Sequence, residues 1–185
     1  MRKVKFRLLG IRITITFWFA VIFAVYAVHS TDSLYVIGAI TAHELSHILA
    51  LTILGGRISG INLALTEVNI RTEMDGLTPN KRIVVALAGP VVNILTGLAV
   101  YKVNPVFSAS NLLIGVFQLL PVVSLDGGTV FDILLNDRNQ WVKKAVSFLI
   151  ASAMLFIGIL LLLISKYNFS LLIIGIYLIF VTITD

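Results

Sequence analysis

The sequence predicts an all-α polytopic membrane protein with about six transmembrane helices, a short β-hairpin or strand segment after the second helix and a broken fourth helix. Of its 185 residues, 58% are hydrophobic and 12% are charged, and the mean hydropathy is +1.02. Soluble domains carry about 25% charged residues, so half that share indicates an integral membrane protein. Short polar connections separate apolar runs that are long enough to cross a bilayer. The length favours a single domain over residues 1–185.

The composition also limits the kinds of site and partner. The chain has no cysteine, so a disulfide framework and a thiolate metal site are both excluded, and any metal must be held by histidine and carboxylate. The net charge of +5 could suggest nucleic acid, but the positive residues lie at the ends of apolar runs. That distribution sets membrane topology, so we expect the lipid bilayer as a partner and no nucleic acid.

The first predicted span covers residues 8–28 and follows a basic opening segment. A cleavable signal peptide is the alternative, but its apolar part is usually about 7–15 residues and this run is longer. We therefore expect an uncleaved helix. His29, in the polar connection that follows, is interpreted as a loop or interface residue because no second ligand accompanies it at helical spacing.

The second predicted span, residues 34–54, contains the sequence His43-Glu-Leu-Ser-His47. Two residues four apart on a helix differ in direction by only about 40°, so both imidazoles can reach one metal ion. Glu44 lies beside the first histidine, close to a water that the metal would hold. A hydrogen-bonded core cluster or a proton relay is the alternative. Two of the chain's three histidines fall in this pattern, which favours metal binding.

The polar segment after this span differs in texture. Gly55 and Gly56 should end the helix, because glycine suits the left-handed capping position. Over residues 57–72 apolar and polar residues alternate, which predicts extended strands, and 73–81 reads as a polar loop. These strands are either a surface hairpin that only links two spans or an open edge that pairs with an extended peptide.

The third predicted span, residues 83–101, contains Ala88-Gly-Pro-Val-Val-Asn93. A Gly-Pro pair inside a helix favours a kink. Asn93 then places an amide with hydrogen-bond donors and an acceptor inside the membrane. The alternative for both features is close helix packing, for which small residues and asparagine are often used in lipid.

The fourth apolar region, residues 106–135, is interrupted by Pro121 and by Gly127-Gly128. Broken backbone at membrane depth is tolerated only when it is buried in protein or lines a water-filled cavity. Asp126 lies at this break and is the candidate third ligand, which would leave a fourth position for water. Asp132 is less favoured, because it lies near the cytoplasmic end of the span and is expected to be solvated.

The fifth and sixth predicted spans cover residues 145–164 and 169–184. Neither contains a charge within the membrane, so we assign them to bundle packing and lipid exposure. Six spans with a cytoplasmic N-terminus put twelve of the 14 lysine and arginine residues on the cytoplasmic side. These are Arg2, Lys3, Lys5, Arg7, Arg12, Arg57, Arg71, Lys81, Arg82, Arg138, Lys143 and Lys144.

Lys102 and Lys166 are the two positive residues left on the outer side. The asymmetry satisfies the positive-inside rule. It predicts a multi-pass membrane protein with both termini in the cytoplasm, and we expect the cell membrane of a bacterium or archaeon. The histidine motif is then nearer to the cytoplasmic face.

Three motifs together resemble the site-2 protease family of intramembrane zinc metalloproteases. They are His43-Glu-Leu-Ser-His47, Ala88-Gly-Pro-Val-Val-Asn93 and Leu119-Leu-Pro-Val-Val-Ser-Leu-Asp-Gly-Gly128. The resemblance covers residues 10–135. Six spans without an inserted peptide-binding domain look most like the sporulation branch that processes a sigma-factor precursor. That branch often carries a C-terminal regulatory nucleotide-binding domain, which this chain lacks, so we expect either a naturally short member or a truncated chain.

The resemblance implies one Zn²⁺ per chain with His43, His47 and Asp126 as ligands and Glu44 as general base. It also implies that Asn93 lies near the active site. The family usually has asparagine where this chain has Gln118, often proline where it has Ser124, and commonly a basic residue where it has Thr129. Gln118 keeps the amide on a longer arm, so these departures put substrate positioning in doubt and leave the ligands intact.

We therefore expect a zinc-dependent intramembrane endopeptidase that cleaves in or near a transmembrane segment. Water bound to zinc and activated by Glu44 would be the nucleophile, and Asn93 and Gln118 would bind the substrate backbone. The substrate would be a membrane protein or membrane-associated peptide, and regulatory membrane partners are expected. The alternatives are a small transporter or metal channel, and an inactive protease-like scaffold. No convincing internal repeat supports the transporter, and the intact Glu44 argues against the scaffold.

Overall fold

The computed structural model describes residues 3–8, 11–16, 31–63, 68–73, 76–135, 139–165 and 170–184. Several predicted features lie outside these residues: 17–28 of the first span, the connection at 29–30 with His29, and the polar positions 136–138 and 166–169. Contacts divide the chain into two compact units, Met1–Gly115 and Val116–Asp185.

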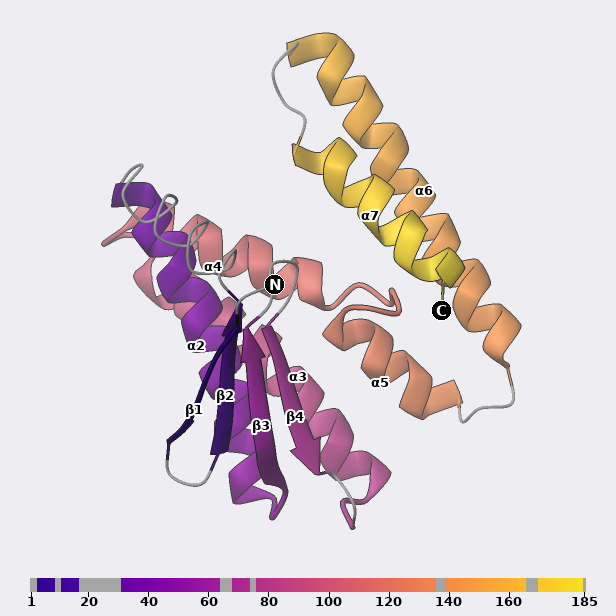
Figure 1. Ribbon diagram of the computed structural model, residues 1–185. Coiled ribbons are helices and arrows are strands. Elements are labelled where there is room, and N and C mark those ends of the chain that lie inside the picture. The colour runs from indigo at the N-terminus through magenta and orange to yellow at the C-terminus, as the bar shows by residue number, and fades with distance from the viewer. Residues whose placement is uncertain are drawn as a thin grey trace. The chain divides into compact units, whose positions relative to one another are not determined.

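The first unit contains a four-stranded sheet in the order β1-β2-β3-β4 (Figure 1). The strands are β1 (Lys3–Leu8), β2 (Ile11–Thr16), β3 (Arg57–Leu63) and β4 (Val68–Glu73). β1 pairs with β2 and β3 pairs with β4 in antiparallel fashion, whereas β2 and β3 are parallel. The extended backbone predicted for residues 57–72 is found in β3 and β4.

The two N-terminal strands were not expected, and they correct the prediction of a helix from residue 8. Leu8 ends β1, and β2 continues to Thr16. The sequence of β2, Ile-Arg-Ile-Thr-Ile-Thr, alternates strictly between apolar and polar residues and is rich in β-branched side chains. A period of two with β-branching favours a strand, and the long apolar run that follows β2 led to the prediction of a helix instead. The described chain therefore contains more β structure than predicted.

The helix that carries the histidine motif is α2 (Thr31–Ile53). Its C-terminus has the two hydrogen bonds of a Schellman motif, in which the Gly55 and Gly56 amides donate to the Thr52 and Leu51 carbonyls at 3.2 and 2.9 Å. Gly55 has a φ of 92°, a conformation that a side chain disfavours. The predicted glycine stop is confirmed, and it directs the chain from α2 into β3.

The helix α3 (Pro79–Val100) packs against α2 and continues through Pro90. It is followed by α4 (Pro105–Gln118), which begins with the Asn104 side chain accepting a bond from the Phe107 amide at 2.9 Å. Glycines allow close approach of α3 and α4, because a Cβ on Gly97 would lie 3.0 Å from the Ser108 carbonyl and one on Gly115 2.9 Å from the Pro90 carbonyl. The two helices therefore form a tightly packed antiparallel pair.

The second unit begins at the end of α4 and contains α5 (Asp126–Leu135), α6 (Gln140–Ser165) and α7 (Ser170–Thr184). Residues 119–125 are not helical, which confirms the break predicted in the fourth apolar region. α6 and α7 lie side by side as a helical hairpin (Figure 1). The core of the unit is formed by Val122, Leu125, Ala151 and Leu178.

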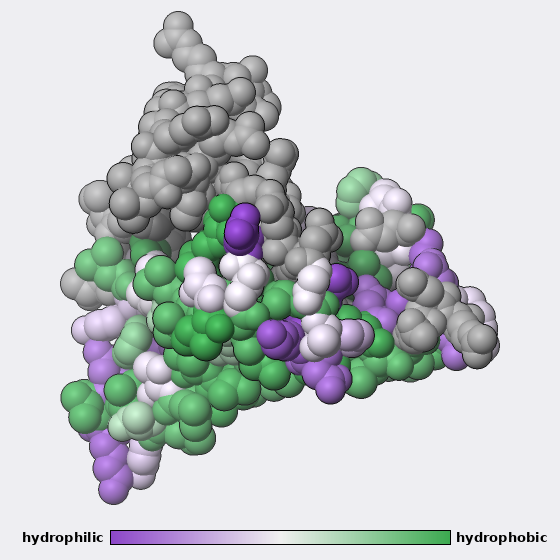
Figure 2. Space-filling view, turned by 90° about the horizontal axis from the view of Figure 1, so that it is seen from below, coloured by the Kyte–Doolittle hydropathy of each residue, from purple (hydrophilic) through white to green (hydrophobic). Residues whose placement is uncertain are grey.

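Among the described residues, three helices are long and apolar enough to cross a membrane: Asp32–Ile53, Pro79–Val100 and Gln140–Ile164. Pro105–Gln118 and Leu171–Thr184 are shorter apolar helices. Figure 2 shows hydrophobic residues across much of the visible surface. On α2, Leu45, Leu49 and Ile53 are at least half exposed at a spacing of four residues, which is the arrangement expected of a lipid-facing stripe.

Candidate metal centre

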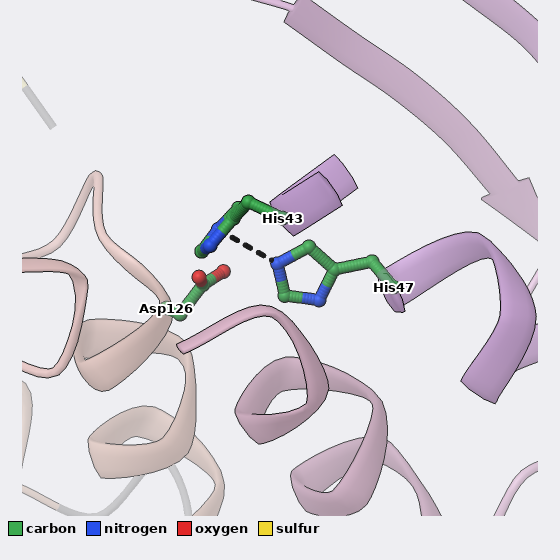
Figure 3. Close-up of side chains that lie close together, drawn as sticks. All are labelled: His43, His47 and Asp126. Atoms are coloured by element: carbon green, nitrogen blue, oxygen red, sulfur yellow. Dashed lines mark hydrogen bonds between the residues drawn. The ribbon is translucent and has the colours of Figure 1, made fainter. Parts of the chain in front are cut away.

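His43 and His47 project from successive turns of α2 and meet edge to face (Figure 3). Their ring centroids are 4.6 Å apart, and the two Nε2 atoms are 3.0 Å apart. His43 is 2% exposed and His47 is half-buried. The spacing of four residues therefore brings one nitrogen of each ring to the same point, as the sequence predicted.

A backbone carbonyl of α3 fixes the orientation of the His47 ring. His47 Nδ1 lies 2.8 Å from the Val85 carbonyl oxygen, which can only accept, so Nδ1 carries the proton and donates it. In a neutral imidazole this leaves the lone pair on Nε2, which faces His43. Metal-binding histidines almost always have their second nitrogen held in this way.

Gly89 leaves room for both rings. A Cβ at this position would overlap His47 Nε2 and would lie 2.7 Å from His43 Cε1 and 2.8 Å from His43 Nε2. The sequence predicted a kink at Gly89-Pro90, which stays a prediction, and both residues lie inside the helix α3. The role of this glycine is to admit the imidazoles at the surface of α3.

Asp126 is the first residue of α5, and the turn that presents it depends on two glycines. A Cβ on Gly127 would lie 2.6 Å from the Leu120 carbonyl oxygen, and one on Gly128 would overlap the Val122 carbonyl. Both contacts are with backbone, which cannot move aside as a flexible side chain can. The Gly-Gly pair is therefore required because the 119–123 segment folds back over the first turn of α5.

His43, His47 and Asp126 form a group that could hold a metal ion, with one ligand atom of each within 4.8 Å of the others (Figure 3). Two ligand nitrogens about 2.0–2.1 Å from a tetrahedral zinc lie about 3.3 Å apart, close to the 3.0 Å between the Nε2 atoms. Two imidazoles and one carboxylate are also a donor set that catalytic zinc accepts, with one position open. These residues fit zinc.

The other predicted site residues lie on the same helices or at their ends. Glu44 follows His43 in α2 and is half-buried. Asn93 is fully buried one helical turn after Gly89, and neither its Oδ1 nor its Nδ2 has a hydrogen-bond partner among the described residues. Gln118 ends α4, and its Oε1 is buried without a partner. Buried amides without partners are costly in the absence of a ligand or water, so both side chains can accept further hydrogen bonds.

Three contributors were not found from the sequence. The Val85 carbonyl is a backbone atom, which no residue type marks. Lys143 and Ser147 belong to α6, and both are less than 10% exposed. The sequence predicted Lys143 in the cytoplasmic polar loop before the fifth span, and it assigned the span that contains Ser147 to packing and lipid exposure. Polar residues four apart at the start of an apolar helix were the available signal. Two departures from the motif, Ser124 and Thr129, are exposed, and the Thr129 hydroxyl donates to the Leu125 carbonyl at 3.5 Å.

Comparison with known proteins shows similarity to a solved structure. Neither the protein-family models nor the curated proteins contain a match to the sequence. Among solved structures, the site-2 protease from Methanocaldococcus jannaschii matches with a TM-score of 0.69 and 19% sequence identity, covering 100% of this chain and 95% of that chain. The chain therefore has the site-2 protease fold that its motifs predicted. This fold and the apolar helices support the assignment of the chain as a membrane protein.

Proposed function

We propose that the chain is an intramembrane zinc metalloprotease of the site-2 protease family, with residues 1–185 as its proteolytic domain. The observation that carries the proposal is the paired His43 and His47 imidazoles, with Nδ1 of His47 bonded to Val85 and both Nε2 atoms converging. The shared fold supports it at the level of architecture. The motif supplies the chemistry that a fold alone does not specify.

In this proposal His43, His47 and Asp126 hold one zinc ion. When bound, zinc polarises the substrate carbonyl and lowers the pKa of a coordinated water towards about 7. The Val85 carbonyl keeps the His47 ring in the tautomer that presents Nε2. Gly89 keeps α3 from crowding the nitrogens. The protein thus supplies histidine ligands that are already oriented towards the position of the metal.

Glu44 moves the proton. As water adds to the scissile carbonyl carbon, the Glu44 carboxylate accepts a proton from it. The same carboxyl then gives this proton to the amide nitrogen, the carbon–nitrogen bond breaks, and a carboxyl and an amine are released. Glu44 can play this role because it follows a ligand directly in α2. The reaction needs no other co-reactant than water.

The substrate is a membrane protein or membrane-associated peptide, and its helix must unwind because helical carbonyls are already hydrogen-bonded. The strand order leaves the outer side of β4 without a strand neighbour in the described part of the chain, and an unwound segment could pair there. Asn93 and Gln118 offer amides to its backbone. The sporulation-type substrate suggested above stays a prediction.

The sheet indicates how the protein is oriented in the membrane. Because β2 pairs with β3, the four strands β1 to β4 lie on one side of any membrane that the protein crosses. Six positive residues fall in these strands: Lys3, Lys5, Arg7, Arg12, Arg57 and Arg71. By the positive-inside rule that side is the cytoplasm. We propose that β3, which follows α2, places the metal centre towards the cytoplasmic face.

Substitution of the proposed base tests the function. The purified wild type and Glu44→Gln would be incubated in proteoliposomes with a panel of tagged single-span membrane proteins, and cleavage followed by mass spectrometry. We expect Glu44→Gln to cut about 10²–10⁴-fold more slowly while binding as much zinc as the wild type. Asp32→Asn, an exposed acid in the first turn of the same helix, is the control and should cleave normally. Cleavage by Glu44→Gln at the wild-type rate would refute the assignment.

A further inference from the structure

One face of the largely apolar helix α6 buries two polar side chains. Lys143, Ser147 and Ala151 follow one another at intervals of four residues and are 8%, 2% and 0% exposed. Their neighbours Lys144 and Phe148 are exposed. A buried lysine in an apolar helix is costly and needs a specific partner, so this face has a task other than contact with lipid.

These three residues of α6 contact the segment that carries Asp126, both before and after Asp126 in the sequence. Lys143 Nζ is 3.0 Å from Asp132 Oδ1, six residues after Asp126. The Ser147 hydroxyl donates to the Pro121 carbonyl at 3.2 Å, five residues before it. Ala151 belongs to the same buried cluster as Val122 and Leu125.

Close backbone contacts join the two parts of this segment, which lie before and after Asp126. Gly127 and Gly128 leave no room between the first turn of α5 and the backbone of Leu119 to Val123. Residues 119–125 are not helical, so the Pro121 carbonyl cannot be satisfied within a regular helix and takes its bond from Ser147. A shift at Pro121 or at Asp132 would therefore be passed to the carboxylate between them.

We propose that Lys143 and Ser147 are positioning residues of the metal centre, which act through Asp126. α6 then has two functions: its exposed face meets lipid, and its buried face sets where the third ligand is held. This inference rests on the proposed function, because it takes Asp126 as a metal ligand. Neither residue belongs to the motifs that suggested that function.

Cobalt affinity tests the inference without reference to proteolysis. Co²⁺ would be titrated into the metal-free protein in competition with a chelator, and the visible spectrum would report the ligand geometry. Replacing a group that orients a ligand typically weakens metal binding about 10–100-fold, which is the loss expected for Lys143→Met. Ser147→Ala should lose about 5-fold, as expected for one neutral hydrogen bond. Lys143→Arg, which keeps the charge for Asp132, should restore most of the affinity.

Two controls separate positioning from general damage. Lys144→Met removes the exposed lysine next in sequence and should bind Co²⁺ like the wild type. In an Asp126→Ala background, Lys143→Met should cause no further loss, because residues that act through one group are not additive. Wild-type affinity in Lys143→Met, or an equal loss with and without Asp126, would overturn the inference.

The outcome can be told apart from failure of the proposed function. If the wild type binds no Co²⁺, the proposed metal centre is wrong, and amide exchange in the metal-free protein decides the inference about α6. Faster exchange at Gly127, Gly128 and Thr129 in Lys143→Met than in Lys144→Met supports positioning of this turn. Equal exchange in the two variants refutes it.

Discussion

The two histidines and Asp126 are presented by two contrasting kinds of structure. His43 and His47 lie on an unbroken helix, and the spacing of 3.6 residues per turn alone puts them on one face. Asp126 starts a ten-residue helix after a non-helical segment. Its position depends on two glycines without room for a side chain and on a face of α6 reached through a bond between residues 26 apart in sequence.

The contrast concerns what a substitution can disturb. In the histidine region, the atoms that crowd Gly89 are the ends of imidazole side chains. In the aspartate region, the atoms that crowd Gly127 and Gly128 are backbone carbonyls. Side chains can rotate away, which disturbs the metal site but leaves the fold intact. Backbone can move away only if the local fold changes. An added methyl group should therefore weaken metal binding alone in the histidine region, and both metal binding and stability in the aspartate region.

The largest effect on metal binding is expected for Gly89→Ala. The added methyl would occupy the space of His47 Nε2 and crowd His43, so the rings must turn and separate. We expect zinc affinity to fall at least about 100-fold, at the upper end of losses from disturbed ligand orientation, with little change in thermal stability. Chelator competition and a melting curve in the same detergent measure both quantities.

Gly38→Ala is the matched control for this change. It lies in α2, and its added Cβ would be 3.5 Å from Phe107 Cε2, an ordinary contact. Because alanine is the better helix residue, the variant should fold at least as well as the wild type and bind zinc normally. If Gly89→Ala also binds zinc normally, the pairing of the two imidazoles against α3 is not the metal site.

Gly128→Ala should reduce the stability of the fold as well as metal binding. Its Cβ would overlap the Val122 carbonyl, so the 119–123 segment must separate from α5. Overpacking of this kind costs about 1–3 kcal/mol of stability, and we expect a lower unfolding temperature as well as lost zinc. Thr129→Ala, at the exposed next position, should change neither. Unchanged stability in Gly128→Ala would show that the turn is less constrained than its contacts indicate.

A smaller and purely functional effect is expected for Asn93→Ala. The amide is buried with no hydrogen-bond partner, so its removal leaves no other group unsatisfied. If it binds the substrate backbone, kcat/KM should fall about 10-fold, with zinc content and melting temperature unchanged. Leu95→Ala, at a position 60% exposed on the same helix, is the control. A parallel loss of stability would instead assign Asn93 to packing between helices.

The sequence predicted the parts of this molecule that depend on local periodicity. The helices α2, α3, α6 and α7, the Gly55-Gly56 stop and the convergence of His43 and His47 follow from spacing that neighbouring residues contain. The break before Asp126 was also predicted, because Pro121 and Gly127-Gly128 stand in an apolar run. What holds that break was not, since the contacts of Lys143 and Ser147 join residues far apart in sequence.

The N-terminal strands show a different limit. Residues 11–16 contain a visible alternation of isoleucine with arginine and threonine, yet they adjoin a long apolar run. The prediction treated both as one apolar run, so the first predicted span began at residue 8. Besides its neighbour β1, β2 pairs with β3, more than 40 residues away, and no local pattern could have identified that second partner. Period should be read before hydropathy at the edges of apolar runs.

The central claim is that a histidine pair and an aspartate from two such different regions bind one zinc ion. Metal analysis of the purified wild type beside Asp126→Ala, with Thr129→Ala as the control, tests it most directly. The account predicts about one zinc per chain in the wild type and in Thr129→Ala, and its loss in Asp126→Ala. Zinc content in Asp126→Ala equal to that of the wild type would contradict it, because Asp126 would then not be a ligand.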